Sequence, residues 1–96
     1  MLGKIKNRVK SILSFSSKEY WEKRYQTGGN SGAGSYDAKA KYKADVLNNI
    51  LKENSINNVI EFGCGDGNNL AFYNIEYYCG LDVSQTAIEI CISKYQ

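Results

Sequence analysis

The residues best suited to chemistry stand in one short stretch, "VIEFGCGDGNNL", residues 59–70. Three glycines, Gly63, Gly65 and Gly67, alternate with other residues directly after an apolar run that contains the acid Glu61. Glycine permits a sharp turn and lets a ligand approach the main chain without meeting a Cβ atom. The pattern therefore indicates a backbone-lined ligand site, where the N–H groups at a helix start would receive a carboxylate or phosphate.

A second acid stands at the matching place further along the chain. Asp82 lies near the end of the run "YYCGLDV", residues 77–83, and follows Gly63 by 19 positions. An acid at the tip of the second strand of a strand–helix–strand unit accepts hydrogen bonds from the ribose hydroxyls of a nucleoside. The structural alternative is that the glycines only form a tight turn and that Asp82 only caps the next helix.

These residues need a parallel sheet to bring them together. Apolar periodicity predicts alternating elements: a helix over 36–54 ending at the C-cap Asn54, a strand over 57–62, a short helix over about 67–73, a strand over 77–83, and a helix over 85–95 capped by Ser84. Two strands joined through a helix by short connections pair in parallel with a right-handed crossover. We therefore expect an α/β fold in which the glycines and Asp82 meet at one sheet edge.

The first 35 residues differ in composition from this unit. Residues 1–18 carry five basic residues and no acid, and apolar residues at helical spacing predict a basic amphipathic helix over 2–15. Residues 19–35 combine an aromatic helix, N-capped by Ser17, with the Gly/Ser-rich stretch "TGGNSGAGS", residues 27–35. Such a loop is either a lid or binding loop, or an ordinary mobile connection.

The composition limits the class of protein. The 96 residues, 43% hydrophobic and 23% charged, suit one small globular domain. Histidine is absent, which removes the commonest general base, and the spacing of the three cysteines matches no metal motif. We expect reduced thiols in a cytoplasmic protein. A net charge of +2 gives no clear indication of nucleic acid. The basic 2–15 segment would either touch anionic lipid or nucleic acid, or pack on the body or on a partner with its basic face in solvent.

The third glycine distinguishes between nucleotide types. The dinucleotide fingerprint G-x-G-x-x-G requires glycine where this chain has Asn68, whereas Gly67 gives G-x-G-x-G. Glu61 would repel a pyrophosphate and would suit a cationic sulfonium or ammonium group.

"VIEFGCGDGNNL" resembles motif I of the class I S-adenosylmethionine-dependent methyltransferases, and "YCGLDVSQTAIEIC" is similar to their second strand and helix. The lead-in "YWEKRYQTGGNSGAGSY" resembles a subgroup, some members of which accompany surface-polysaccharide genes.

The resemblance, which covers residues 18–95, implies S-adenosylmethionine as cofactor and gives roles to the first motif. Glu61 would organise the amino-acid end of the cofactor, directly or through water. Gly63, Cys64 and Gly65 would pass beneath its methionine and ribose portions. Methyl transfer in this family is a direct in-line displacement, so Cys64 is not expected to act as a nucleophile.

The remaining implied contacts come from both strand ends and from the lead-in. Asn68 or Asn69 would bond the cofactor carboxylate. Asp82 would hold the ribose hydroxyls and Val83 would pack on the adenine. Tyr25 and the 28–35 loop would close over the site.

The chain departs from the family pattern in its extent. The family fold is a Rossmann-like, seven-stranded sheet, of which residues 36–96 would form the N-terminal half, truncated after the second strand and its helix. We expect a truncated methyltransferase that is inactive alone, or one whose missing half is a partner chain, or a non-catalytic interaction or membrane-surface module. A NAD-type nucleotide-binding domain is the remaining alternative. The methyl acceptor is not indicated; the subgroup implies a sugar or small metabolite.

Overall fold

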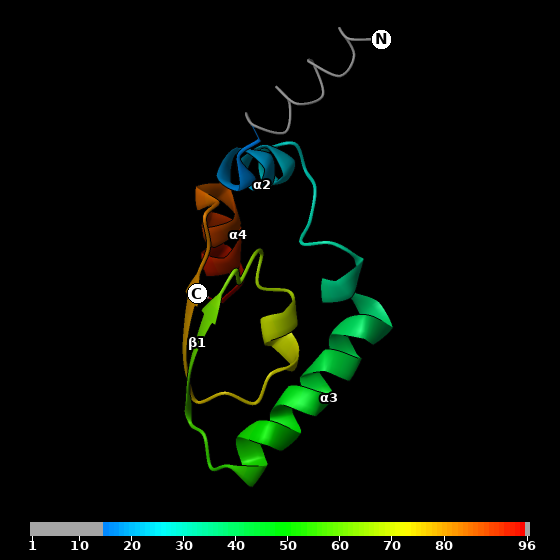
Figure 1. The fold of residues 1–96 in the computed structure, drawn as a ribbon, viewed down its shortest axis with the longest axis vertical. Coiled ribbons are helices and arrows are strands. Elements are labelled where there is room, and N and C mark those ends of the chain that lie inside the picture. The colour runs from blue at the N-terminus through cyan, green and yellow to red at the C-terminus, as the bar shows by residue number, and fades with distance from the viewer. Residues whose placement is uncertain (1–14, 96) are drawn as a thin grey trace, which may run out of the picture.

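The computed structural model describes residues 15–95, which form a two-stranded sheet with helices at one end and along one side (Figure 1). The elements in chain order are α2 (Ser17–Gln26), the 3-10 turn η1 (Ala33–Ser35), α3 (Asp37–Glu53), β1 (Asn58–Phe62), the 3-10 turn η2 (Asn69–Phe72), β2 (Tyr77–Leu81) and α4 (Gln85–Tyr95). The basic helix predicted over 2–15 lies outside the described residues. Between residues 15 and 95, no helix has the length and apolar character needed to cross a bilayer.

The sheet confirms the predicted parallel pairing. β1 and β2 run side by side in a register from Asn58 opposite Tyr77 to Phe62 opposite Leu81. The pairing continues beyond β1, because the N–H groups of Gly63 and Cys64 both donate to the carbonyl oxygen of Leu81, at 2.6 and 3.1 Å. The start of the glycine stretch is thereby fixed against the end of β2, as parallel strands require.

Two predicted elements are shorter than expected. β2 ends at Leu81, so Asp82 and Val83 stand in the connection to α4 and not in a strand. The predicted helix over 67–73 is only the 3-10 turn η2, four residues long. The stretch before η2 is occupied by a turn in which the side chain of Asp66 accepts the N–H of Asn68 at 3.1 Å, so no α-helical hydrogen bonding begins there.

The start of α2 corrects the predicted N-cap. Ser16, not Ser17, caps the helix, and its hydroxyl accepts the N–H of Glu19 at 3.3 Å. Ser16 and Glu19 have the spacing of a capping box, and the ring of Phe15 lies 6.1 Å from that of Tyr20, as in a hydrophobic staple. These two features favour Ser16 over its neighbour. α2 therefore crosses the boundary expected between residues 18 and 19.

The core lies between α3, the glycine stretch, α2 and α4. Its buried apolar residues are Tyr25, Ala40, Ala44, Leu51, Cys64 and Ala87. The apolar residues whose spacing predicted the 36–54 helix are Tyr36, Ala40, Ala44, Leu47, Ile50 and Leu51. Of these, Ala40, Ala44 and Leu51 are buried, whereas the prediction was wrong for Ile50, which is 46% exposed. Asn54 is the C-cap of α3, as predicted.

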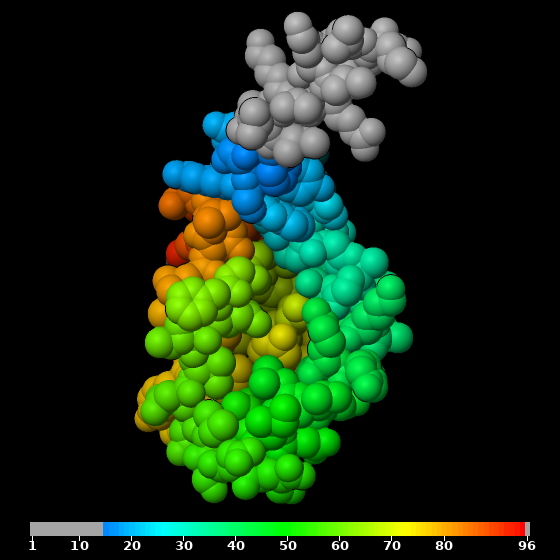
Figure 2. Space-filling view, viewed as in Figure 1, coloured from blue at the N-terminus to red at the C-terminus, as the bar shows by residue number. Residues whose placement is uncertain are grey.

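α2 and α4 are far apart in the sequence but pack against each other, as the space-filling view shows (Figure 2). The carboxylate of Glu22 accepts the N–H groups of Gln85 and Thr86, at 2.8 and 3.1 Å. Ser84 confirms its predicted capping role, because its hydroxyl accepts the N–H of Ala87 at 3.0 Å. Together they satisfy three of the N–H groups that a helix start leaves unpaired.

One face of the sheet is open. Both strands alternate exposed and partly covered residues, and the exposed set is mostly apolar. It includes Ile60, Phe62, Tyr77 and Leu81, of which Phe62 is 82% exposed. An apolar sheet face normally packs on another element.

Candidate functional site

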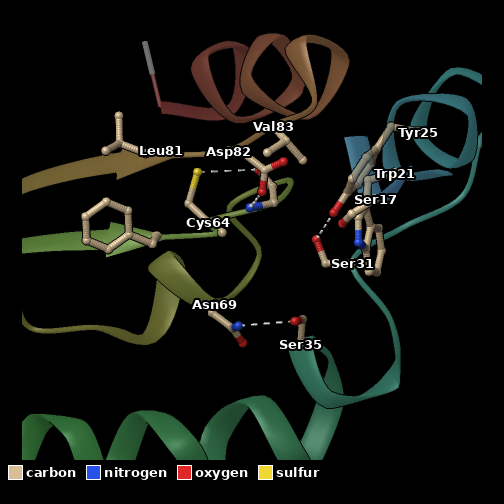
Figure 3. A pocket seen from close by; sticks show the side chains of 13 residues that line it. Ser17, Trp21, Tyr25, Ser31, Ser35, Cys64, Asn69, Leu81, Asp82 and Val83 are labelled. Atoms are coloured by element: carbon tan, nitrogen blue, oxygen red, sulfur yellow. Dashed lines mark hydrogen bonds between the residues drawn. The ribbon is translucent and has the colours of Figure 1, made fainter. Parts of the chain in front are cut away.

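A pocket of about 560 Å³ opens where the two strands end (Figure 3). One wall is formed by residues 62–65 and 81–83, and the other by α2 and the 27–35 loop. The lining residues are Ser17, Trp21, Tyr25, Ser31, Ser35, Phe62, Gly63, Cys64, Gly65, Asn69, Leu81, Asp82 and Val83. The volume falls within the range of small-molecule sites, roughly 300–1,000 Å³.

The carboxylate of Asp82 joins the two strand ends. Its Oδ2 accepts the N–H of Gly65 at 2.9 Å, and its Oδ1 accepts the N–H of Ser84 at 2.9 Å. Asp82 does not cap α4 itself, because the N–H that it accepts belongs to Ser84, the N-cap residue of that helix. A carboxylate offers about four lone-pair sites, so each oxygen keeps room for one more donor. Holding the loop and receiving a ligand are compatible here.

Most of the residues expected at the site do meet in the pocket. Seven of the nine line it: Tyr25, Gly63, Cys64, Gly65, Asn69, Asp82 and Val83. Glu61 and Asn68 stand outside the lining. Asn68 is engaged with the 27–35 loop, because its Nδ2 donates to the carbonyl oxygen of Ser35 at 2.6 Å.

Glu61 lies on the covered face of the sheet. Its neighbours in the strand, Ile60 and Phe62, point to the exposed face, so the alternation of β1 turns Glu61 the other way. There its Oε1 accepts the hydroxyl of Tyr78 at 2.7 Å. Burial and this bond raise the pKa of Tyr78. The expected role of Glu61 at the amino-acid end of a cofactor stays a prediction.

The side chain of Asn69 has one buried acceptor that is unpaired within residues 15–95. Its Nδ2 donates to Ser35 Oγ at 3.2 Å, whereas its Oδ1 is buried and has no hydrogen-bond partner among the described residues. Buried polar atoms are normally paired. Because this oxygen is enclosed by protein, a molecule in the pocket does not reach it as the side chain stands.

Cys64 is buried, with 7% of its surface exposed. Burial, reinforced by Cys91 and by the charges of Asp82 and Glu61, raises the pKa of the Cys64 thiol to about 11. The thiolate is the nucleophilic form of cysteine. At neutral pH this side chain is therefore a packing group and not a nucleophile.

Trp21 and Asp66 were not identified from the sequence, and Ser31 was expected only as a member of the 28–35 loop. Trp21 lines the pocket beside Tyr25, with their rings 6.1 Å apart. Ser31 lines it as well and shares a hydrogen bond of 2.5 Å with the Tyr25 hydroxyl. Asp66 lies behind the lining and is 3% exposed. The sequence signal that could have identified Asp66 is an acid between two glycines, at a position that belongs to no helix or strand pattern.

Comparison with known protein families, with curated proteins and with solved structures finds no match for this chain.

Proposed function

We propose that this chain binds S-adenosylmethionine and its product S-adenosylhomocysteine, as the cofactor-binding part of a class I methyltransferase. The observation that carries the proposal is the position of Asp82. Its carboxylate stands at the end of the second strand, bonded at 2.9 Å to Gly65 in the glycine stretch, and both line one pocket of suitable size. The motif resemblance supports the choice of ligand.

The residues of the pocket suit the parts of such a cofactor. The spare lone pairs of Asp82 would accept the two ribose hydroxyls. Val83 lines the pocket and is 53% exposed, which leaves an apolar surface for the adenine. Trp21 and Tyr25 offer aromatic surface on the opposite wall, where a sulfonium is attracted to the ring faces.

The chemistry expected of this chain is binding and orientation. S-adenosylmethionine supplies the electrophilic methyl group on its sulfonium. The glycine stretch and Asp82 would hold the nucleoside, and the aromatic wall would limit the access of water. We propose that the acceptor, a sugar hydroxyl or small metabolite, is bound by a partner chain or further segment. The three free cysteines suit a cytoplasmic setting, which we propose as well.

Calorimetric titration tests the proposal, with S-adenosylhomocysteine as ligand and NAD as the control for the dinucleotide-binding alternative. We expect a Kd on the order of 10 μM for the first, about −7 kcal/mol, and no binding of the second. Binding of NAD alone, or of neither compound, would contradict the proposal.

A change on the ligand isolates the role of Asp82 without disturbing the fold. An analogue of S-adenosylhomocysteine that lacks the ribose 2′-hydroxyl should bind roughly tenfold or more weakly, because it loses a hydrogen bond to a charged acceptor. Asp82→Asn should lower the affinity for S-adenosylhomocysteine. It should also reduce the ratio between that affinity and the affinity for the analogue. Asp45→Asn, the same change at an exposed site on α3, is the matched control. Equal affinities for the two ligands would contradict the assigned role.

A further inference from the structure

A buried carboxylate lies behind the pocket wall. Asp66 is 3% exposed and is not part of the pocket lining. Three donors converge on its two oxygens: the hydroxyl of Tyr36 and the N–H of Ser31 at 3.4 Å on Oδ2, and the N–H of Asn68 at 3.1 Å on Oδ1. Its own N–H donates to Ser31 Oγ at 3.0 Å.

The burial of this group requires its partners. An isolated carboxylate away from water is strongly unfavourable and would take up a proton. Burial alone would raise the pKa of Asp66, but the hydrogen bonds from Tyr36, Asn68 and Ser31 outweigh it and hold the pKa below its usual range. Asp66 is therefore ionised at neutral pH, and the hydrogen bonds it accepts are of the stronger, charge-assisted kind.

The partners make Asp66 a junction between distant segments. Ser31 and Tyr36 precede it by 35 and 30 residues, so only the bond to Asn68 is local. Bonds from Asn68 and Asn69 to Ser35 strengthen the same junction. Hydrogen bonds within the protein thus attach the 27–35 loop to the glycine stretch, without a ligand.

The junction extends into the pocket through one hydroxyl. Ser31 Oγ accepts the N–H of Asp66 and also shares the 2.5 Å hydrogen bond with the Tyr25 hydroxyl. Ser31 and Tyr25 both line the pocket (Figure 3), and both lie directly against Gly65, where an added Cβ would meet Ser31 Oγ and would lie 2.8 Å from the Tyr25 hydroxyl oxygen. Asp66, which is outside the lining, is thus connected through Ser31 to two residues of the pocket wall.

We propose that Asp66 is a positioning residue, which fixes Ser31 and Tyr25 against the glycine stretch and so sets the affinity of the pocket without touching the ligand. The 27–35 loop is then a wall that is in place before binding, and not a lid that the ligand must draw in. The identity of the ligand rests on the proposed function, whereas the attachment of the loop does not. Preorganisation of this kind raises affinity because no ordering of the loop accompanies binding.

Two substitutions weaken the junction without altering the pocket lining. Asp66→Asn keeps the size of the side chain but leaves one acceptor oxygen in place of two, so the three donors cannot all be satisfied. Tyr36→Phe removes one donor from a residue outside the lining. Asp45→Asn is again the matched control.

The first readout is hydrogen exchange without ligand. The amide of Ser31 should exchange roughly tenfold faster in both variants, while the amides within α3 keep their protection, because one bond lost at the junction opens the loop locally. Equal acceleration along the whole chain, or no acceleration at Ser31, would overturn the proposal. If Asp66→Asn fails to fold, Tyr36→Phe alone provides the test, because Tyr36 lies outside the pocket lining.

The second readout is ligand affinity, followed through the fluorescence of Trp21, the single tryptophan of the chain. Each variant should bind S-adenosylhomocysteine about tenfold more weakly than the unaltered protein. The double variant, Asp66→Asn with Tyr36→Phe, should have the same affinity as either single variant, because both substitutions act on one junction. Multiplying effects, or unchanged affinity, would overturn the positioning role. Absence of binding by the unaltered protein would refute the proposed function and leave the attachment of the loop to the exchange experiment.

Discussion

The substitution Gly67→Ala gives the sharpest test of the packing beneath the pocket. Gly67 has φ +78°, a left-handed conformation, and an added Cβ would lie 2.5 Å from Cys91 Sγ and 3.1 Å from Tyr95 Cε2. The Tyr95 hydroxyl also donates to the carbonyl oxygen of Gly67 at 2.6 Å, so the backbone and α4 cannot separate freely.

The magnitude follows from two contributions. Left-handed backbone in a residue with a Cβ costs about 1–2 kcal/mol. Inserting a methyl group into a filled space costs about 1–3 kcal/mol more. Gly63 is the internal control, because its φ is +77° but an added Cβ there meets no atom within 4 Å. We therefore expect a loss of unfolding free energy of about 2–5 kcal/mol for Gly67→Ala and about 1–2 kcal/mol for Gly63→Ala.

Urea unfolding of the two variants measures this difference. In a Cys91→Ala background the atom nearest to the added methyl group is gone, and Gly67→Ala should then cost about 1–2 kcal/mol less than it does in the unaltered chain. Equal losses at positions 63 and 67, or no relief from Cys91→Ala, would refute the described contact between the glycine stretch and α4.

Three further predictions follow from other contacts. Hydrogen bonding to Thr86 holds the pKa of Glu22 below its ordinary value of 4.5, so its contribution to stability is present above that pH and is lost as the pH falls through the lower, folded pKa. Glu22→Gln should therefore lower the Tm near pH 7, and a difference that persists unchanged at pH 3 would count against this. Cys79 is exposed and Cys64 is buried, so Ellman's reagent at pH 8 should modify Cys79 at least about tenfold faster; similar rates would contradict the described burial. Phe62→Lys should change the unfolding free energy by no more than about 0.5 kcal/mol while lowering the binding of an apolar dye; a large destabilisation would mean that the side chain is packed.

Much of the fold could be predicted from local patterns. Apolar spacing correctly indicated Ala40, Ala44 and Leu51 as buried positions of α3, although it also included the exposed Ile50. Ser84 indicated the start of α4. The short connections between strands indicated parallel pairing, and that pairing brought Asp82 to Gly65. Each of these signals acts over a few residues or follows from a general rule of chain connection.

The remainder depended on contacts that no local pattern encodes. The role of Asp66 comes from partners 30 and 35 residues away, and that of Glu22 from N–H groups 63 and 64 residues away. The orientation of Glu61 was decided by the phase of β1, which placed it beside Tyr78 and not in the pocket. The prediction of a helix over 67–73 was wrong because a few apolar residues are compatible with a 3-10 turn as well as with a helix.

The bond between Glu22 and the start of α4 has a consequence for the order in which the molecule is made. The ribosome produces residue 22 well before residues 85 and 86, and at about 5–20 residues per second that interval lasts roughly 3–13 seconds. During it, α2 and the 27–35 loop have neither the glycine stretch nor α4 to pack on for most of the time. The pocket therefore cannot be complete before residues 85 and 86 have been made, and until then α2 lacks the helix on which it packs.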